Sequence, residues 1–123
     1  MDFGTYIAEL RERKGFSLRE LEKRAGDISH VYIWRLEKGD RDSPSPETLD
    51  KLSKALDVSD REWELALLLL RTEINDDLFQ VARKRTDIPM SDIEPVATMS
   101  FRGNRPTDEA GWIRMIEFVR DFV

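Results

Sequence analysis

The sequence predicts an all-α fold, with five short helices in residues 1–70 and a smaller helical region in residues 71–123. Three observations support this prediction. Apolar residues recur at helical spacing in short segments, residues that can cap a helix precede them, and a glycine or proline follows or interrupts most of them. A chain of 123 residues can form one domain, or a domain of about 60 residues with a second helical piece.

The five N-terminal helices have recognisable starts. Ser17, Ser29, Ser45 and Ser59 each precede a helical segment, where a serine hydroxyl can accept from a free backbone N–H group. Ser17 with Glu20, and Ser59 with Glu62, also have the spacing of a capping box. In a capping box, each of the two side chains accepts a hydrogen bond from the backbone N–H of the other residue. We expect helices over residues 3–14, 18–25, 30–38 and 46–56, and a fifth that follows Ser59 and contains residues 65–70.

The region after residue 70 is less regular. A short helix is expected after Asn75 and is broken at Pro89. A second is capped by Ser91 with Glu94, and Pro95 limits it or bends it. Residues 102–106 predict a tight turn. Thr107 is expected to cap the last helix. One face of that helix is apolar and is a candidate dimer interface, with the alternative that it is core of this region: Trp112, Met115, Ile116, Val119 and Phe122.

Composition excludes several classes of protein. The absence of cysteine excludes disulfides and thiolate metal sites, and a single histidine leaves no metal-binding or catalytic pattern, so neither an enzyme nor a cofactor is expected. The longest apolar run, residues 65–70, is far shorter than the roughly 18 residues of a membrane span, and no export signal is present. A cytoplasmic protein is therefore expected. The run is interpreted as core, with a dimer surface as the alternative.

The pattern of short capped helices in residues 10–56 is typical of a helix-turn-helix, so double-stranded DNA is the first partner to consider. The net charge of −5 does not favour DNA, but residues 1–61 are near neutral, with 12 Lys and Arg against 13 Asp and Glu. The third helix would enter the major groove. Its candidate base contacts are His30, Val31, Tyr32, Trp34 and Arg35. The candidate phosphate contacts are Ser17, Arg19, Ser29, Lys38 and Arg41.

Alternatives remain for some of these residues. Arg35 can donate two hydrogen bonds to a guanine edge, or it can form a surface ion pair with an acid such as Glu37. Trp34 suits a DNA contact and a packing role equally. A protein-interaction module or antitoxin that uses the same domain to hold a toxin is the rival function, and the acidic total favours it.

Residues 3–70 resemble the Cro/CI (XRE-type) helix-turn-helix family. The resemblance is carried by Leu10, Arg11, residues 15–17, Glu20, Leu21, Ala25, Gly26, residues 28–30, Tyr32, Ile33, residues 35–39, 44–49 and 55–58. It implies a five-helix, lambda-repressor-like domain that binds an inverted-repeat operator as a homodimer and represses transcription. This chain departs from the family at Leu18, where glutamine is usual, at Asp27, an extra residue in the turn, and in a longer loop after Gly39.

The C-terminal region is similar to that of DdrO-type repressors. The similarity is carried by residues 101–106, followed by Asp108, Trp112 and an apolar helix. ImmR-type repressors are related to these in how they are regulated. The resemblance implies C-terminal dimerisation and inactivation by an ImmA/IrrE-like metallopeptidase. The candidate cleavage site is Phe101 and Arg102. Cleavage there would detach the last helix. Without the resemblance, this segment is simply a loop.

Overall fold

The computed structural model describes residues 1–39, 43–101 and 105–122, and every regular element in these ranges is an α-helix. The prediction of an all-α fold is therefore confirmed. The helices are α1 (Phe3–Arg13), α2 (Leu18–Ala25), α3 (His30–Glu37), α4 (Pro46–Leu56), α5 (Asp60–Leu69), α6 (Asp76–Lys84), α7 (Met90–Ala97) and α8 (Glu109–Arg120).

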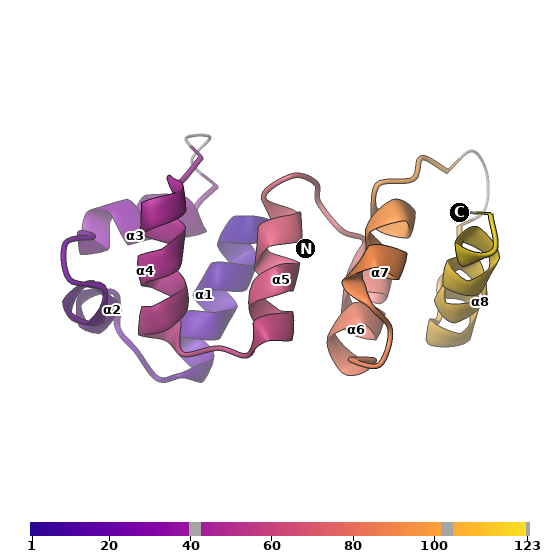
Figure 1. Cartoon of the computed structure of the whole chain (residues 1–123). Coiled ribbons are helices and arrows are strands. Elements are labelled where there is room, and N and C mark those ends of the chain that lie inside the picture. Colours follow the sequence, from indigo (N-terminus) through magenta and orange to yellow (C-terminus); the bar gives the residue numbers. More distant parts are fainter. Residues whose placement is uncertain (40–42, 102–104, 123) are drawn as a thin grey trace.

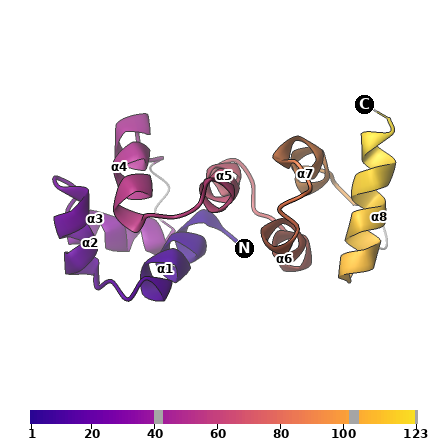
Figure 2. The ribbon, with the colours of Figure 1, turned by 60° about the horizontal axis from the view of Figure 1, so that its bottom comes forward.

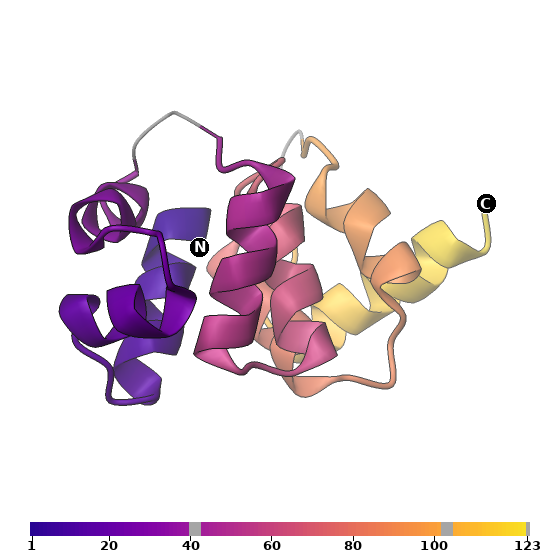
Figure 3. The same ribbon diagram turned by 60° about the vertical axis from the view of Figure 1, so that its left-hand side comes forward.

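The helices follow one another along an elongated molecule. In Figure 1, α2 and α3 lie at one end, α5 lies near the middle, and α8 lies at the opposite end. Figures 2 and 3, which turn the molecule by 60° about two different axes, also show α2 and α8 far apart. The C-terminal helix is therefore remote from the helix-turn-helix in one copy of the chain.

The serine caps of the N-terminal helices are present as predicted. Ser17, Ser29, Ser45 and Ser59 are the N-cap residues of α2, α3, α4 and α5, and each hydroxyl oxygen accepts from the backbone N–H three residues later. A capping box forms at the start of α5, where Glu62 also accepts from the backbone N–H of Ser59. Only the serine half of the predicted box is described at Ser17, whose oxygen accepts from the N–H of Glu20.

Three predicted boundaries in the C-terminal region are wrong. Helix α6 already ends at Lys84, and Pro89 is the N-cap of α7, which begins at Met90 without a side-chain cap. The proposed cap at Ser91 therefore lies inside α7. Pro95 also lies inside this helix, which ends two residues later at Ala97. The N-cap of α8 is Asp108 rather than Thr107, because the Asp108 carboxylate accepts from the N–H of Gly111 at 2.8 Å.

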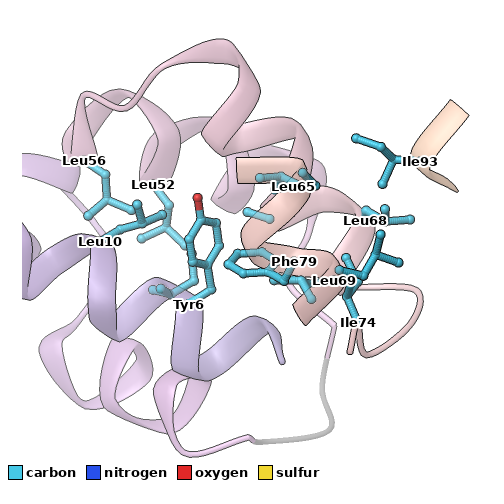
Figure 4. Packing of buried hydrophobic residues seen from close by; sticks show 14 of the residues in the cluster. Tyr6, Leu10, Leu52, Leu56, Leu65, Leu68, Leu69, Ile74, Phe79 and Ile93 are labelled. Atoms are coloured by element: carbon cyan, nitrogen blue, oxygen red, sulfur yellow. The ribbon is translucent and has the colours of Figure 1, made fainter. Parts of the chain in front are cut away.

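A single apolar core extends from α1 into α6 and α7. The rings of Tyr6 and Phe79 meet edge to face with their centroids 4.9 Å apart, and both side chains are fully buried beside Leu65 (Figure 4). Burial raises the pKa of Tyr6 to about 12, so its hydroxyl stays neutral. The core therefore joins the N-terminal helices to the C-terminal region.

Polar contacts reinforce this junction. The guanidinium of Arg83, on α6, lies 3.1 and 3.2 Å from the carboxylate oxygens of Glu9 on α1. Arg61, on α5, donates to the backbone carbonyl oxygens of Arg85 and Ile88 in the α6–α7 connection. These contacts bind α6 to both α1 and α5, so the orientation of the C-terminal helices is set by the N-terminal domain.

The shared core predicts that the two regions unfold together. Phe79→Ala should lower the free energy of unfolding by about 3–5 kcal/mol, because it leaves a cavity between α1, α5 and α6. Chemical denaturation followed through NMR signals of α3 and of α7 should give one coincident transition at a lower denaturant concentration. Gln80→Ala, at an exposed site of the same helix, is the control. If α3 kept its original midpoint in the Phe79 variant, the regions would be independent.

Candidate nucleic-acid interface

The helix-turn-helix consists of α2, a short turn and α3. The turn contains Gly26, whose φ of +91° lies in the region that favours glycine, and Ile28, which is buried. Lys51 of α4 donates to both carboxylate oxygens of Asp27, at 2.7 and 2.9 Å. Hydrogen bonding by Lys51 lowers the pKa of Asp27. The residue identified as an extra one in the turn is thus attached to α4.

The inner face of α3 packs closely on α1. Ile33 and Leu36 are buried, and a Cβ atom at Gly4 would lie 2.4 Å from the backbone oxygen of Leu36. No side chain fits at that distance, so glycine at position 4 allows the two helices to approach each other.

The C-terminal end of α3 is attached to α1 by a bidentate ion pair. The Arg11 side chain donates to the two carboxylate oxygens of Glu37 at 2.7 and 2.9 Å, and also to the backbone oxygen of Phe16 at 2.8 Å. The side chains of Arg11 and Glu37 are only 13% and 7% exposed. The hydrogen bonds from Arg11 to Glu37 raise the pKa of Arg11. This ion pair was not identified from the sequence, since the partners are 26 positions apart and no local pattern connects them.

The outer face of α3 carries most of the predicted base contacts. Val31 and Trp34 are both 48% exposed, and Arg35 is exposed as well. His30 is partly exposed at the start of the helix, whereas Tyr32 is partly buried against the core. Glu37, the alternative partner of Arg35, is bound to Arg11 instead. Within the described ranges, Arg35 has no ion pair, so its guanidinium is available to a ligand.

The predicted phosphate contacts lie around this face. Ser17 and Ser29 are exposed N-cap residues at the starts of α2 and α3, and their hydroxyl oxygens are already acceptors for backbone N–H groups. Arg19 and Lys38 are exposed and have no ion pair with any described residue. Arg41 lies outside the described residues. Leu18, at the position where the family usually has glutamine, is partly buried against the core.

A second contact that the sequence did not indicate joins α2 and α3. One carboxylate oxygen of Glu22 lies 3.0 Å from Nδ1 of His30. Nothing in the periodicity of either helix indicates it, because the pairing depends on the angle at which α2 and α3 cross.

The residues predicted at a dimer interface divide into two groups. Trp112 and Ile116 are 1% exposed and lie in the core of the chain itself, where α8 packs on α6 and α7. Met115 and Val119 are partly buried, and Phe122 is 76% exposed. Phe118, on the same helix, is 61% exposed, and the centroids of its ring and the Phe122 ring are 4.8 Å apart.

The predicted cleavage site is only partly described. Phe101 is partly buried, and its ring packs edge to face on Trp112 with the centroids 5.8 Å apart. Arg102 lies outside the described residues. Phe101 is therefore in contact with the helix that cleavage would detach.

The all-helical fold and the α2–turn–α3 unit define a helix-turn-helix domain, and the helix-turn-helix family model matches residues 7–63. The HTH-type transcriptional regulator SinR of Bacillus subtilis (strain 168) is 39% identical over 56 residues, which cover 46% of this chain and 50% of that protein. SinR of Bacillus licheniformis matches with the same values. The chain thus spans about half the length of the curated relatives it matches. The family match ends before α6, so the resemblance of the C-terminal region to DdrO-type repressors stays a prediction.

Among the described residues, no helix combines the length and apolar character needed to cross a membrane. Likewise, in residues 1–39, 43–101 and 105–122, no three or more metal-binding side chains of the His, Cys, Asp or Glu type lie together.

The buried ion pair at the end of α3 yields a test of how this helix is held. Glu37→Ala should lower the free energy of unfolding by about 2–4 kcal/mol, because it leaves the largely buried Arg11 guanidinium without its carboxylate. Asp50→Ala is the matched control, since it removes an exposed pair with Lys54 and should cost less than about 0.5 kcal/mol. Equal losses in urea denaturation of the two variants would contradict a special role for the Arg11–Glu37 pair.

Proposed function

We propose that this chain is a sequence-specific DNA-binding transcriptional repressor that acts as a homodimer on an inverted-repeat operator. The observation that carries the proposal is the outer face of α3, where Arg35 is exposed without an ion pair among the described residues. The same helix is fixed to α1 at its inner face. An exposed helix on a rigid support is what insertion into the major groove requires.

On this proposal, the first two turns of α3 contact the bases. Arg35 donates two hydrogen bonds to the O6 and N7 atoms of a guanine, and Val31 packs against a thymine methyl group. Trp34 and Tyr32 lie to the sides of this contact. Arg19 and Lys38 bind phosphates and, with Ser17 and Ser29, set the register of the helix on the duplex.

The dimer is proposed to form through α8. Gly111, Met115, Phe118 and Phe122 are spaced by four, three and four residues, which places them on one stripe of this helix. Beside Gly111 lies a groove of about 650 Å³, lined in part by Pro106, Met115 and Phe118. In an antiparallel pair of α8 helices, Met115 lies opposite Phe118, and Phe122 lies opposite the groove at Gly111.

The charges beside this stripe suit the same arrangement. Arg114 and Asp121 are exposed and have no ion pair with the described residues. In the antiparallel register just given, Arg114 of each copy lies near Asp121 of the other, two positions from directly opposite, so two ion pairs flank the apolar contact. The face is therefore complementary to itself, as a twofold interface requires.

The dimer would present two α3 helices about 34 Å apart to one side of the duplex. Binding of the first half-site makes the second binding event intramolecular, so dimerisation raises operator affinity. Cleavage near Phe101 and Arg102 by an ImmA/IrrE-like metallopeptidase would separate α8 from α1–α7. Loss of the dimer contact would then release the operator.

Arg35 provides the direct test of DNA recognition. Arg35→Ala should weaken binding to an operator selected from random duplexes by about 1–3 kcal/mol and relax the preference at one base pair. Lys84→Ala removes one positive charge from α6, away from α3, and should have little effect on either quantity. An Arg35 variant with unchanged affinity and preference in a mobility-shift titration would contradict the assignment.

A protein-interaction module or antitoxin is the second candidate function, because Val31 and Trp34 expose apolar surface on the same face of α3. The salt dependence of binding distinguishes the two candidates. Phosphate contacts release counterions, so DNA affinity should fall steeply as salt is added, whereas an apolar protein contact should change little.

The α8 stripe yields a test of the dimer. Phe118→Glu should convert the dimer to a monomer in sedimentation experiments and weaken operator binding, because it introduces a charge at the centre of the apolar contact. Leu67→Glu is the matched control: Leu67 is 39% exposed, but it lies on α5. If the Leu67 variant dissociated while the Phe118 variant stayed dimeric, the interface would lie on α5 instead.

A further inference from the structure

The contact between Glu22 and His30 joins the two helices of the helix-turn-helix at the start of α3. Glu22 Oε2 and His30 Nδ1 are 3.0 Å apart, and the side chains of His30 and Glu22 are 32% and 35% exposed. His30 is the first residue of α3, directly after the N-cap Ser29. It therefore occupies the part of the helix that approaches base edges most closely in helix-turn-helix proteins.

The chemistry of this contact determines how the imidazole is protonated. An ionised carboxylate can only accept hydrogen bonds, so Nδ1 of His30 must carry a proton that it donates to Glu22. In the neutral ring, Nε2 then has no proton and offers a lone pair. Among the described residues, no partner of His30 Nε2 is present, so this acceptor is available to a ligand.

We infer that Glu22 is a positioning residue that makes His30 a hydrogen-bond acceptor toward the major groove. Adenine and cytosine present an amino group there, at N6 and N4, whereas guanine and thymine present only acceptors at the corresponding O6 and O4 positions. His30 would therefore select adenine or cytosine at the base it contacts. The inference rests on the proposed DNA-binding function and adds a specificity determinant to it.

A purely structural role is the competing explanation of the pair. The α2–α3 contact already has an apolar basis, since the two helices pack together and Leu21, Ala25 and Ile33 on them are buried. A single partly exposed hydrogen bond between two side chains adds little stability to such a contact. The pair is thus not needed to hold α3 in place, whereas the orientation and tautomer of the His30 ring depend on it.

The first experiment measures base preference. The full chain and its Glu22→Ala, Glu22→Gln and His30→Ala variants would each select binding sites from a library of random duplex DNA. The wild type should show about tenfold discrimination for adenine or cytosine over guanine and thymine at one position of each half-site. This preference should fall to within about twofold in all three variants, because a glutamine amide can both donate and accept and so does not fix the tautomer.

The preference at the base contacted by Arg35 should stay unchanged in these variants. Glu20→Gln is the matched control, since it removes the same negative charge from α2 without touching His30. It should keep the wild-type preference at the His30 position, even if general DNA affinity rises with the loss of charge.

The second experiment needs no DNA. In the free protein, in a buffer alkaline enough to keep the imidazole neutral, ¹⁵N chemical shifts report which ring nitrogen carries the proton. The wild type should show the Nδ1–H tautomer, and Glu22→Ala should show a mixture. An Nε2–H tautomer in the wild type, or an unaltered site preference in the Glu22 variants, would overturn the inference.

The two experiments separate this inference from the proposed function. If the wild type selects no sequence at all, the DNA-binding proposal fails. If it selects a site that Arg35→Ala alters but the Glu22 and His30 variants do not, DNA binding stands and the role of Glu22 is wrong.

Discussion

The close packing of α3 on α1 is the constraint on which the rest of the structure depends. Glycine at position 4 lets the helices approach until a Cβ there would meet the backbone oxygen of Leu36, and the Arg11–Glu37 pair fastens the last turn of α3. With its inner face occupied in this way, α3 can expose apolar and basic side chains outward without losing its position. A helix held only by its own propensity would be marginally stable at eight residues.

The continuous core has a second consequence. Because Tyr6 and Phe79 pack together, and because Arg83 binds Glu9, the C-terminal helices cannot move freely relative to α1. A dimer formed through α8 would therefore fix not only the stoichiometry but also the distance and angle between two α3 helices. This rigidity would favour operators with one spacing between half-sites, since a flexible linker would tolerate several.

The extent to which the sequence predicted this structure depended on how local each signal is. Serine caps followed by apolar residues at helical spacing specify short-range geometry, so the starts of α2 to α5 were predicted correctly. The boundaries near Pro89 and Thr107 were wrong because two nearby residues could each begin the helix, Pro89 or Ser91 in one case and Thr107 or Asp108 in the other. The local pattern does not decide between them.

The candidate site was predictable in outline for the same reason. Among the residues predicted as base contacts, Val31, Trp34 and Arg35 are exposed as expected, whereas Tyr32 is partly buried. The two contacts that fix and orient α3, Arg11 with Glu37 and Glu22 with His30, join different helices and leave no periodic signal. Trp112 was interpretable as core or as interface, because an apolar stripe does not reveal which neighbour covers it.

Mapping of backbone amide chemical shifts during titration with a selected operator duplex tests the central claim most directly. The account predicts the largest changes in the first two turns of α3 and at the start of α2, with small changes in α6 and α7. Changes concentrated elsewhere, or no saturable change with any selected duplex, would contradict the claim that this chain recognises DNA through α3.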